Sequence, residues 1–103
     1  MQGELCSLIE QEVGHFFVLE KLDGSKISIP IIHLNYFQLN GAQLELNFSY
    51  HTIVIEGLFI DILFDLLISG KSAYVKEFGE RYESMSKPES LYISKAEVME
   101  IER

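Results

Sequence analysis

Two glycine turns, each placed between segments of alternating polarity, constrain this chain more than any other feature. The first is KLDGS at residues 21–25 and the second is LNGA at residues 39–42. Glycine adopts positive φ without steric cost, and short turns of this kind join neighbouring antiparallel strands. We therefore expect the first half of the chain to form a β-meander.

The first turn predicts its own register. A bulged turn with Gly24 at positive φ brings apolar residues together on one face and opposite charges together on the other. A strict two-residue loop would set Lys21 against Lys26 instead. The predicted pairs are Leu19–Ile27, Phe17–Ile29 and Glu20–Lys26.

The second turn predicts a type I′ hairpin, because Asn and Gly both tolerate positive φ. The expected pairs are Phe37–Leu44, Asn35–Leu46, His33–Phe48 and Ile31–Tyr50. One face of this hairpin is then mostly apolar, with His33 and Asn35 as exceptions, and the other face carries polar residues such as Tyr36. Such a division is typical of a half-buried sheet.

The remaining strand predictions depend on weaker signals. Residues 43–55 form one long strand, or two strands with a kink, ending near Gly57. Residues 4–11 are a candidate first strand that turns at Val13–Gly14. Pro30 cannot donate a ladder hydrogen bond, so we expect a bend or a sheet edge there.

The polarity pattern changes period at Leu58. Asp61, Asp65 and Ser69 recur every four residues, which predicts a helix over residues 58–69. Gly70 stands where a helix commonly ends, and Glu56 precedes the helix at the end that favours negative charge.

This helix is more apolar than a surface helix requires. With Asp61 and Asp65 facing outward, a complete inward stripe is already present, formed by Phe59, Leu63, Leu66 and Leu67 with Ile60 and Ile62 at its sides. Leu58, Phe64 and Ile68 are left over, close to the acidic stripe. They are the candidate oligomer interface, and the alternative is that the C-terminal segment covers them through Tyr74, Phe78, Leu91 or Ile93.

The C-terminal third is less determined. Residues 72–78 are strand or helix, residues 79–90 form a flexible loop, and residues 91–93 form a strand. Residues 94–101 continue as a strand or begin a short helix with a capping box. We expect one α+β domain over residues 1–103: a bent antiparallel meander of four to six strands, open or barrel-like, packed on the helix.

The charge balance excludes two classes of partner. The chain has 16 acidic and 8 basic side chains and a net charge of −8. Nucleic acids and anionic membranes both recruit Lys and Arg, so neither is an expected partner. The acidic surface is typical of a solvated face that keeps a protein in solution.

The single cysteine and the N-terminal sequence indicate the compartment. Cys6 is the only cysteine, so no internal disulfide can form, and it has no His or Lys beside it that would activate it as a nucleophile. The start MQGELCSLIEQE does not resemble a signal peptide, and the longest apolar stretch is too short and too charged to span a bilayer. We expect a cytoplasmic protein.

No motif indicates catalysis or a cofactor. His15, His33 and His51 lie 18 residues apart, which is the spacing of successive hairpins, and the predicted register divides them between the two faces of the sheet. The sequence has no Cys pair, HxH, HExxH, phosphate loop or nucleophile elbow, so no metal, cofactor or catalytic residue is predicted. His51, His33 and Tyr36 remain candidate ligand contacts.

These features favour a non-enzymatic interaction or accessory module that associates with itself, most simply as a homodimer. The alternative is a small-molecule-binding domain or minor enzyme that uses a pocket between sheet and helix, with His33 or His51 as its polar group.

Overall fold

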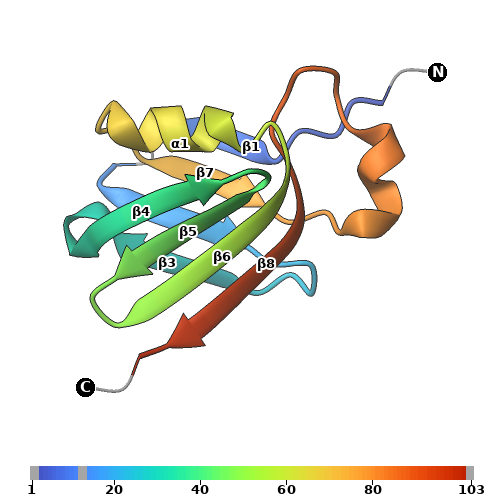
Figure 1. Ribbon diagram of the computed structural model, residues 1–103. Coiled ribbons are helices and arrows are strands. Elements are labelled where there is room, and N and C mark those ends of the chain that lie inside the picture. Colours follow the sequence, from blue (N-terminus) through green and yellow to red (C-terminus); the bar gives the residue numbers. More distant parts are fainter. Residues whose placement is uncertain (1–2, 12–13, 102–103) are drawn as a thin grey trace.

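The computed structural model describes residues 3–11 and 14–101 and shows an α+β fold with two four-stranded sheets and one α-helix (Figure 1). The first sheet has the strand order β1-β7-β2-β3 and the second has the order β4-β5-β6-β8. The elements are β1 (Leu8–Gln11), β2 (Phe16–Glu20), β3 (Lys26–Pro30), η1 (Ile31–His33), β4 (Leu34–Asn40), β5 (Gln43–Phe48), β6 (His51–Leu58), α1 (Asp61–Ile68), β7 (Ala73–Lys76), η2 (Glu80–Met85) and β8 (Tyr92–Glu100).

The expectation of one bent or barrel-like antiparallel sheet is therefore wrong. The chain leaves the first sheet at Pro30, passes through the 3₁₀ turn η1 and starts the second sheet with β4. Because proline cannot continue a hydrogen-bonded ladder, the bend expected at Pro30 becomes the passage between two sheets.

The first sheet contains a hairpin that the sequence predicts correctly. β2 and β3 pair as Phe17–Ile29, Leu19–Ile27 and Glu20–Lys26, and Gly24 has a φ of 89°. The sheet is mixed, because β7 lies parallel to β2 and antiparallel to β1. Of the two alternatives for residues 72–78, strand or helix, the strand is therefore correct. The first strand, expected at residues 4–11, is confirmed over its second half. Val13, the other half of the expected turn at Val13–Gly14, lies outside the described residues.

The second hairpin has a different register from the predicted one. β4 and β5 pair as Phe37–Leu46 and Leu39–Leu44, two residues away from the expected pairing. The two loop residues are Gly41 and Ala42, and only Gly41 has positive φ, as in a type II′ turn. A bulge between Leu34 and Tyr36 then changes the phase of the strand.

Residues 43–55 form neither one long strand nor two strands joined by a kink. The chain reverses between β5 and β6, so that Leu46 pairs with Ile53 and Asn47 with Thr52. β6 also pairs with β8 along nearly its whole length, and a side chain at Gly57 would overlap the carbonyl oxygen of Tyr92. Residues 92–100 are therefore a strand, and the short helix considered for this segment is wrong.

The helix begins later than predicted. β6 continues through Leu58, Phe59 has a positive φ of 55°, and the helix itself starts at Asp61. It ends as expected: the amide of Gly70 donates to Leu67 O and that of Lys71 donates to Leu66 O, which is a Schellman motif. Within residues 3–11 and 14–101, no helix is both long and apolar enough to cross a bilayer.

Both sheets and the helix contribute to one apolar core. Phe17 of the first sheet packs near Phe48 of the second, with ring centroids 5.9 Å apart. Leu63 and Leu67 of α1 are buried, whereas Asp61 and Asp65 are exposed as predicted. Residues 80–85 of the expected loop form the 3₁₀ helix η2.

Candidate functional site

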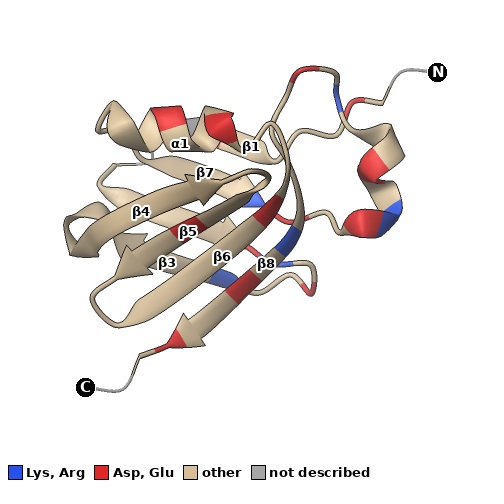
Figure 2. Cartoon of the chain, viewed as in Figure 1, with Lys and Arg blue, Asp and Glu red and all other residues tan. Residues whose placement is uncertain are grey.

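Charged residues are absent from one long part of the chain. No Asp, Glu, Lys or Arg occurs between Lys26 and Glu45, or between Glu45 and Glu56. In Figure 2, β4 and the turn before it are entirely tan, whereas α1, η2 and β8 carry charges. We call η1 and β4, residues 31–40, the uncharged edge.

Large apolar side chains are exposed at this edge and beside it. Ile32 is 83% exposed and Tyr36 is 58% exposed. The amide of Ser49 donates to His33 O at 2.8 Å, which holds the β5–β6 turn against η1, and the next residue, Tyr50, is 61% exposed. Exposed apolar side chains that lie together commonly mark an interaction surface.

The backbone of β4 is also open on one side. Among the strands that the structure describes, β4 is the terminal strand of its sheet and pairs with β5 alone. The pair that closes the two-residue turn, Asn40–Gln43, is a hydrogen-bonded pair, and such pairs alternate with non-hydrogen-bonded pairs along an antiparallel ladder. Phe37 and Leu39 therefore fall in non-hydrogen-bonded pairs, and their N–H and C=O groups point away from β5.

The predicted interface residues Leu58, Phe64 and Ile68 lie in different surroundings. Leu58 belongs to β6, where it pairs with Tyr92. Phe64 packs edge-to-face on Phe37 of β4, with ring centroids 5.4 Å apart, and is half-buried. Ile68 is 61% exposed on the helix. The structure thus brings Phe64 to the uncharged edge and leaves Ile68 open to solvent.

The three histidines lie near the starts of β2, β4 and β6, as their spacing indicates. His33 is exposed in η1 and does not face the core, because the bulge in β4 sets Leu34 opposite Phe48. His51 pairs with Glu100 of β8. Among the residues that the structure describes, no group of three or more His, Cys, Asp or Glu is placed to hold a metal ion.

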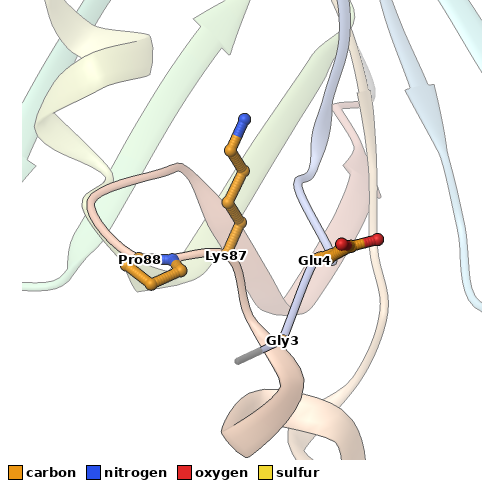
Figure 3. A pocket seen from close by; sticks show the side chains of 4 residues that line it. All are labelled: Gly3, Glu4, Lys87 and Pro88. Carbon is orange, nitrogen blue, oxygen red and sulfur yellow. The ribbon is translucent and has the colours of Figure 1, made fainter. Parts of the chain in front are cut away.

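Several hollows open on the surface of residues 3–11 and 14–101, and the linings of three of them contain no histidine. One has a volume of about 580 Å³ and is lined by Gly3, Glu4, Lys87 and Pro88. Figure 3 shows the Lys87 amino group and the Glu4 carboxylate pointing in different directions. This hollow offers one acid and one base whose side chains do not converge.

Two further hollows have different linings. One, of about 300 Å³, is apolar and is formed by Leu5, Phe78, Tyr82 and Met85. The other, of about 470 Å³, lies between the β4–β5 turn, β6, η2 and β8, and includes the carboxylates of Glu56 and Glu83. The space under α1 is occupied by the apolar core, in which Ile60, Leu63 and Leu67 pack.

A buried carboxylate that the sequence analysis passed over holds distant segments together. Glu77 is 8% exposed, and its two oxygens accept hydrogen bonds from the backbone amides of Leu22, at 3.0 Å, and Ala96, at 3.1 Å. Ala73, Val75 and Glu77 are alternate residues and therefore share one face of the strand, which is buried. An acidic residue on an otherwise apolar strand face is the sequence feature that could have revealed Glu77. Its contacts are all to backbone, which makes it a structural group.

A second polar cluster lies on the outer face of the first sheet. The Glu20 carboxylate accepts a hydrogen bond from Tyr74 at 3.0 Å and forms ion pairs with Lys76 at 3.2 Å and Lys26 at 3.7 Å. The Tyr74 hydroxyl, followed by Lys76, lowers the pKa of Glu20 below its ordinary value. The pKa of Lys26 is raised, chiefly by Tyr74 and also by Glu20. These groups satisfy one another across three strands.

Comparison with known proteins found no matching family model, no matching curated protein and no matching solved structure.

Proposed function

We propose that this protein is a non-enzymatic, self-associating interaction or accessory module of the cytoplasm, and that the homodimer is its working form. The observation that carries this proposal is the exposure of Ile32 and Tyr36 on a segment without charged residues. In a chain with a net charge of −8, two copies repel one another over most of their surface. An uncharged surface is where they meet at the lowest electrostatic cost.

The polar groups of the molecule support a binding role over a catalytic one. Within residues 3–11 and 14–101, every buried side-chain nitrogen and oxygen has a hydrogen-bond partner. Ser7, Ser72 and Glu77, the buried polar residues of that part of the chain, bond to backbone groups. Catalytic groups, in contrast, are commonly held with perturbed protonation in a cleft.

Cys6 is half-buried and bonds weakly to Leu8 O, which suits a thiol kept reduced in the cytoplasm.

Light scattering after size exclusion, over a hundredfold range of concentration, tests this function. We expect a dimer that persists at the higher concentrations and dissociates on dilution. A monomer across the whole range would refute self-association.

A further inference from the structure

We infer that β4 pairs antiparallel with β4 of a second copy of this chain, so that the two second sheets join into one continuous sheet across a two-fold axis at Gln38. This inference rests on the proposed self-association and names its surface. It follows from three properties of the uncharged edge: its open backbone, its side chains and its lack of charge.

The edges of the two sheets differ in how they are protected against pairing. Natural edge strands commonly carry charges or proline, or are very short. β1 has four residues and contains Glu10, β3 contains Lys26 and ends at Pro30, and β8 contains Lys95 and Glu97. β4 has seven residues, LNYFQLN, with neither charge nor proline. Of the four described edge strands, β4 is therefore the one with neither a charge nor a proline, and its bulge lies between Leu34 and Tyr36, before Phe37 and Leu39.

The backbone geometry favours one register. The outward-facing groups belong to Phe37 and Leu39, and the antiparallel register that uses both residues of both copies sets Phe37 opposite Leu39 of the second copy, and Leu39 opposite Phe37 of the second copy. Each pair exchanges two N–H···O=C bonds, which gives four bonds across the axis. Gln38, midway between them, then faces its own symmetry mate.

The side chains suit this register on both faces. On the inner face, the half-buried Phe37 and Leu39 would extend the apolar core across the junction. On the outer face, Gln38 meets Gln38 of the second copy, and Tyr36 meets Asn40 of the second copy. Uncharged pairs of this kind carry no like-charge penalty.

Charge selects a second copy over a basic partner. A basic protein would be drawn to the acidic surfaces of this chain and not to residues 27–44, which carry no charge. An equivalent junction between two copies of β8 would bring Glu97 and Glu100 close to the same acidic residues of the second copy. A junction between two copies of β1 would likewise bring the two Glu10 side chains together. A two-fold dimer also closes, and so leaves no free β4 edge for further growth.

The decisive variant is Gln38→Glu, which places two carboxylates across the axis beside the existing Glu45 carboxylate, now the hydrogen-bond partner of Gln38 at 3.1 Å. We expect the dimer dissociation constant to rise at least tenfold, measured by light scattering. Gln43→Glu is the matched control, because it makes the same substitution on an exposed residue of the same sheet, one strand away from the edge. We expect this control to change the dissociation constant by less than twofold.

A rescue experiment tests the symmetry. Gln38→Lys placed opposite Gln38→Glu restores attraction, so mixing the two variants should give a heterodimer that is tighter than either homodimer. Circular dichroism of each variant confirms that the fold is retained. If the mixture is no tighter than the separate variants, residue 38 does not lie at the axis and the inference is overturned.

Cross-linking gives a second readout that does not depend on weakening the dimer. In a Cys6→Ser background, Gln38→Cys should form an intermolecular disulfide under mild oxidation, because directly opposed residues of antiparallel strands have Cβ atoms close enough for this bond. Glu97→Cys, exposed on β8, should not. If the wild-type protein is a dimer, but Gln38→Glu leaves its dissociation constant unchanged and Gln38→Cys does not cross-link, then this interface is overturned and self-association is retained. A wild-type monomer overturns both proposals.

Discussion

The two sheets have the same number of strands but are held together in different ways. The second sheet is a run of hairpins closed by β8, and its core face is a regular series of apolar side chains. The first sheet joins strands from residues 8–30 with β7, which comes more than 40 residues later, and buried polar side chains at its strand ends reach distant segments: Glu77 reaches the β2–β3 turn and β8, and Ser7 reaches β8. The comparison shows that local pairing can depend on turns and apolar alternation, whereas distant pairing here uses buried hydrogen bonds as well.

The largest expected effect follows from removing the Glu77 carboxylate. Glu77→Ala leaves the amides of Leu22 and Ala96 without their acceptors, and we expect the free energy of unfolding to fall by about 3 kcal/mol. Glu77→Gln, which keeps one acceptor oxygen and the side-chain volume, should lose less than half of that. Urea denaturation followed by circular dichroism measures both. Equal losses for the two variants would show that packing, and not the hydrogen bonds, is responsible.

Ser7→Ala tests a second buried contact, which joins the residue before β1 to β8 of the second sheet. The Ser7 hydroxyl oxygen accepts a hydrogen bond from the Ile93 amide at 2.7 Å, and both residues are fully buried. An amide left without a partner in such a position costs about 2 kcal/mol. Ser28→Ala, at an exposed position of β3, is the control and should leave urea denaturation unchanged. A stability equal to wild type for Ser7→Ala would mean that water replaces the hydroxyl.

Acidification should weaken the first sheet through Glu20. The folded protein holds the pKa of Glu20 below the ordinary value of 4.5, so the folded state binds this proton less readily than the unfolded state does. Its stabilisation is complete above pH 4.5 and is lost as the pH falls through the lowered pKa. Glu20→Gln should therefore show a smaller loss of thermal stability between pH 5 and pH 3, within the roughly two-unit window expected for one group. Parallel melting curves for the two proteins would contradict this role.

The smallest effect is expected on the outer face of the second sheet. Asn47 donates to Glu45 at 3.0 Å and accepts from Thr52 at 3.3 Å, but all three side chains have access to water. Asn47→Ala should lower the free energy of unfolding by about 0.5 kcal/mol, since solvent can satisfy the remaining groups. If Asn47→Ala lowers the free energy of unfolding as much as Ser7→Ala does in the same urea titration, then solvent-accessible and buried hydrogen bonds contribute equally, and the two sheets do not differ in this respect.

The two glycine turns show which registers a sequence can predict. Around Gly24, side-chain pairing decides between loops, because only the bulged turn sets Glu20 against Lys26. Around Gly41, a shift of two residues keeps every side chain on its own face, so the apolar pattern is satisfied equally by both registers. The uncharged character of residues 27–44 removes the charge pairs that would have distinguished them.

The remaining differences come from contacts between distant residues. The helix starts at Asp61 and not at Leu58 because β6 is extended by pairing with β8. The parallel pairing of β2 with β7 has no local signal, so the division into two sheets and the role of Glu77 could not be predicted from the sequence. Of the candidate site residues, His33 and Tyr36 lie on the uncharged edge and Phe64 packs against it. The sequence could not show that β4 would be a terminal strand.

The parallel pairing of β2 with β7 has a consequence for the order in which the chain assembles. Glu20 and Tyr74, which meet across these strands, are 54 residues apart in sequence, whereas each hairpin closes a short loop. Closing a long loop costs more entropy, and strands paired over such distances form slowly. During synthesis the β2–β3 hairpin emerges before β7. The edge of β2 that pairs with β7 therefore remains unpaired until residues 73–76 have left the ribosome.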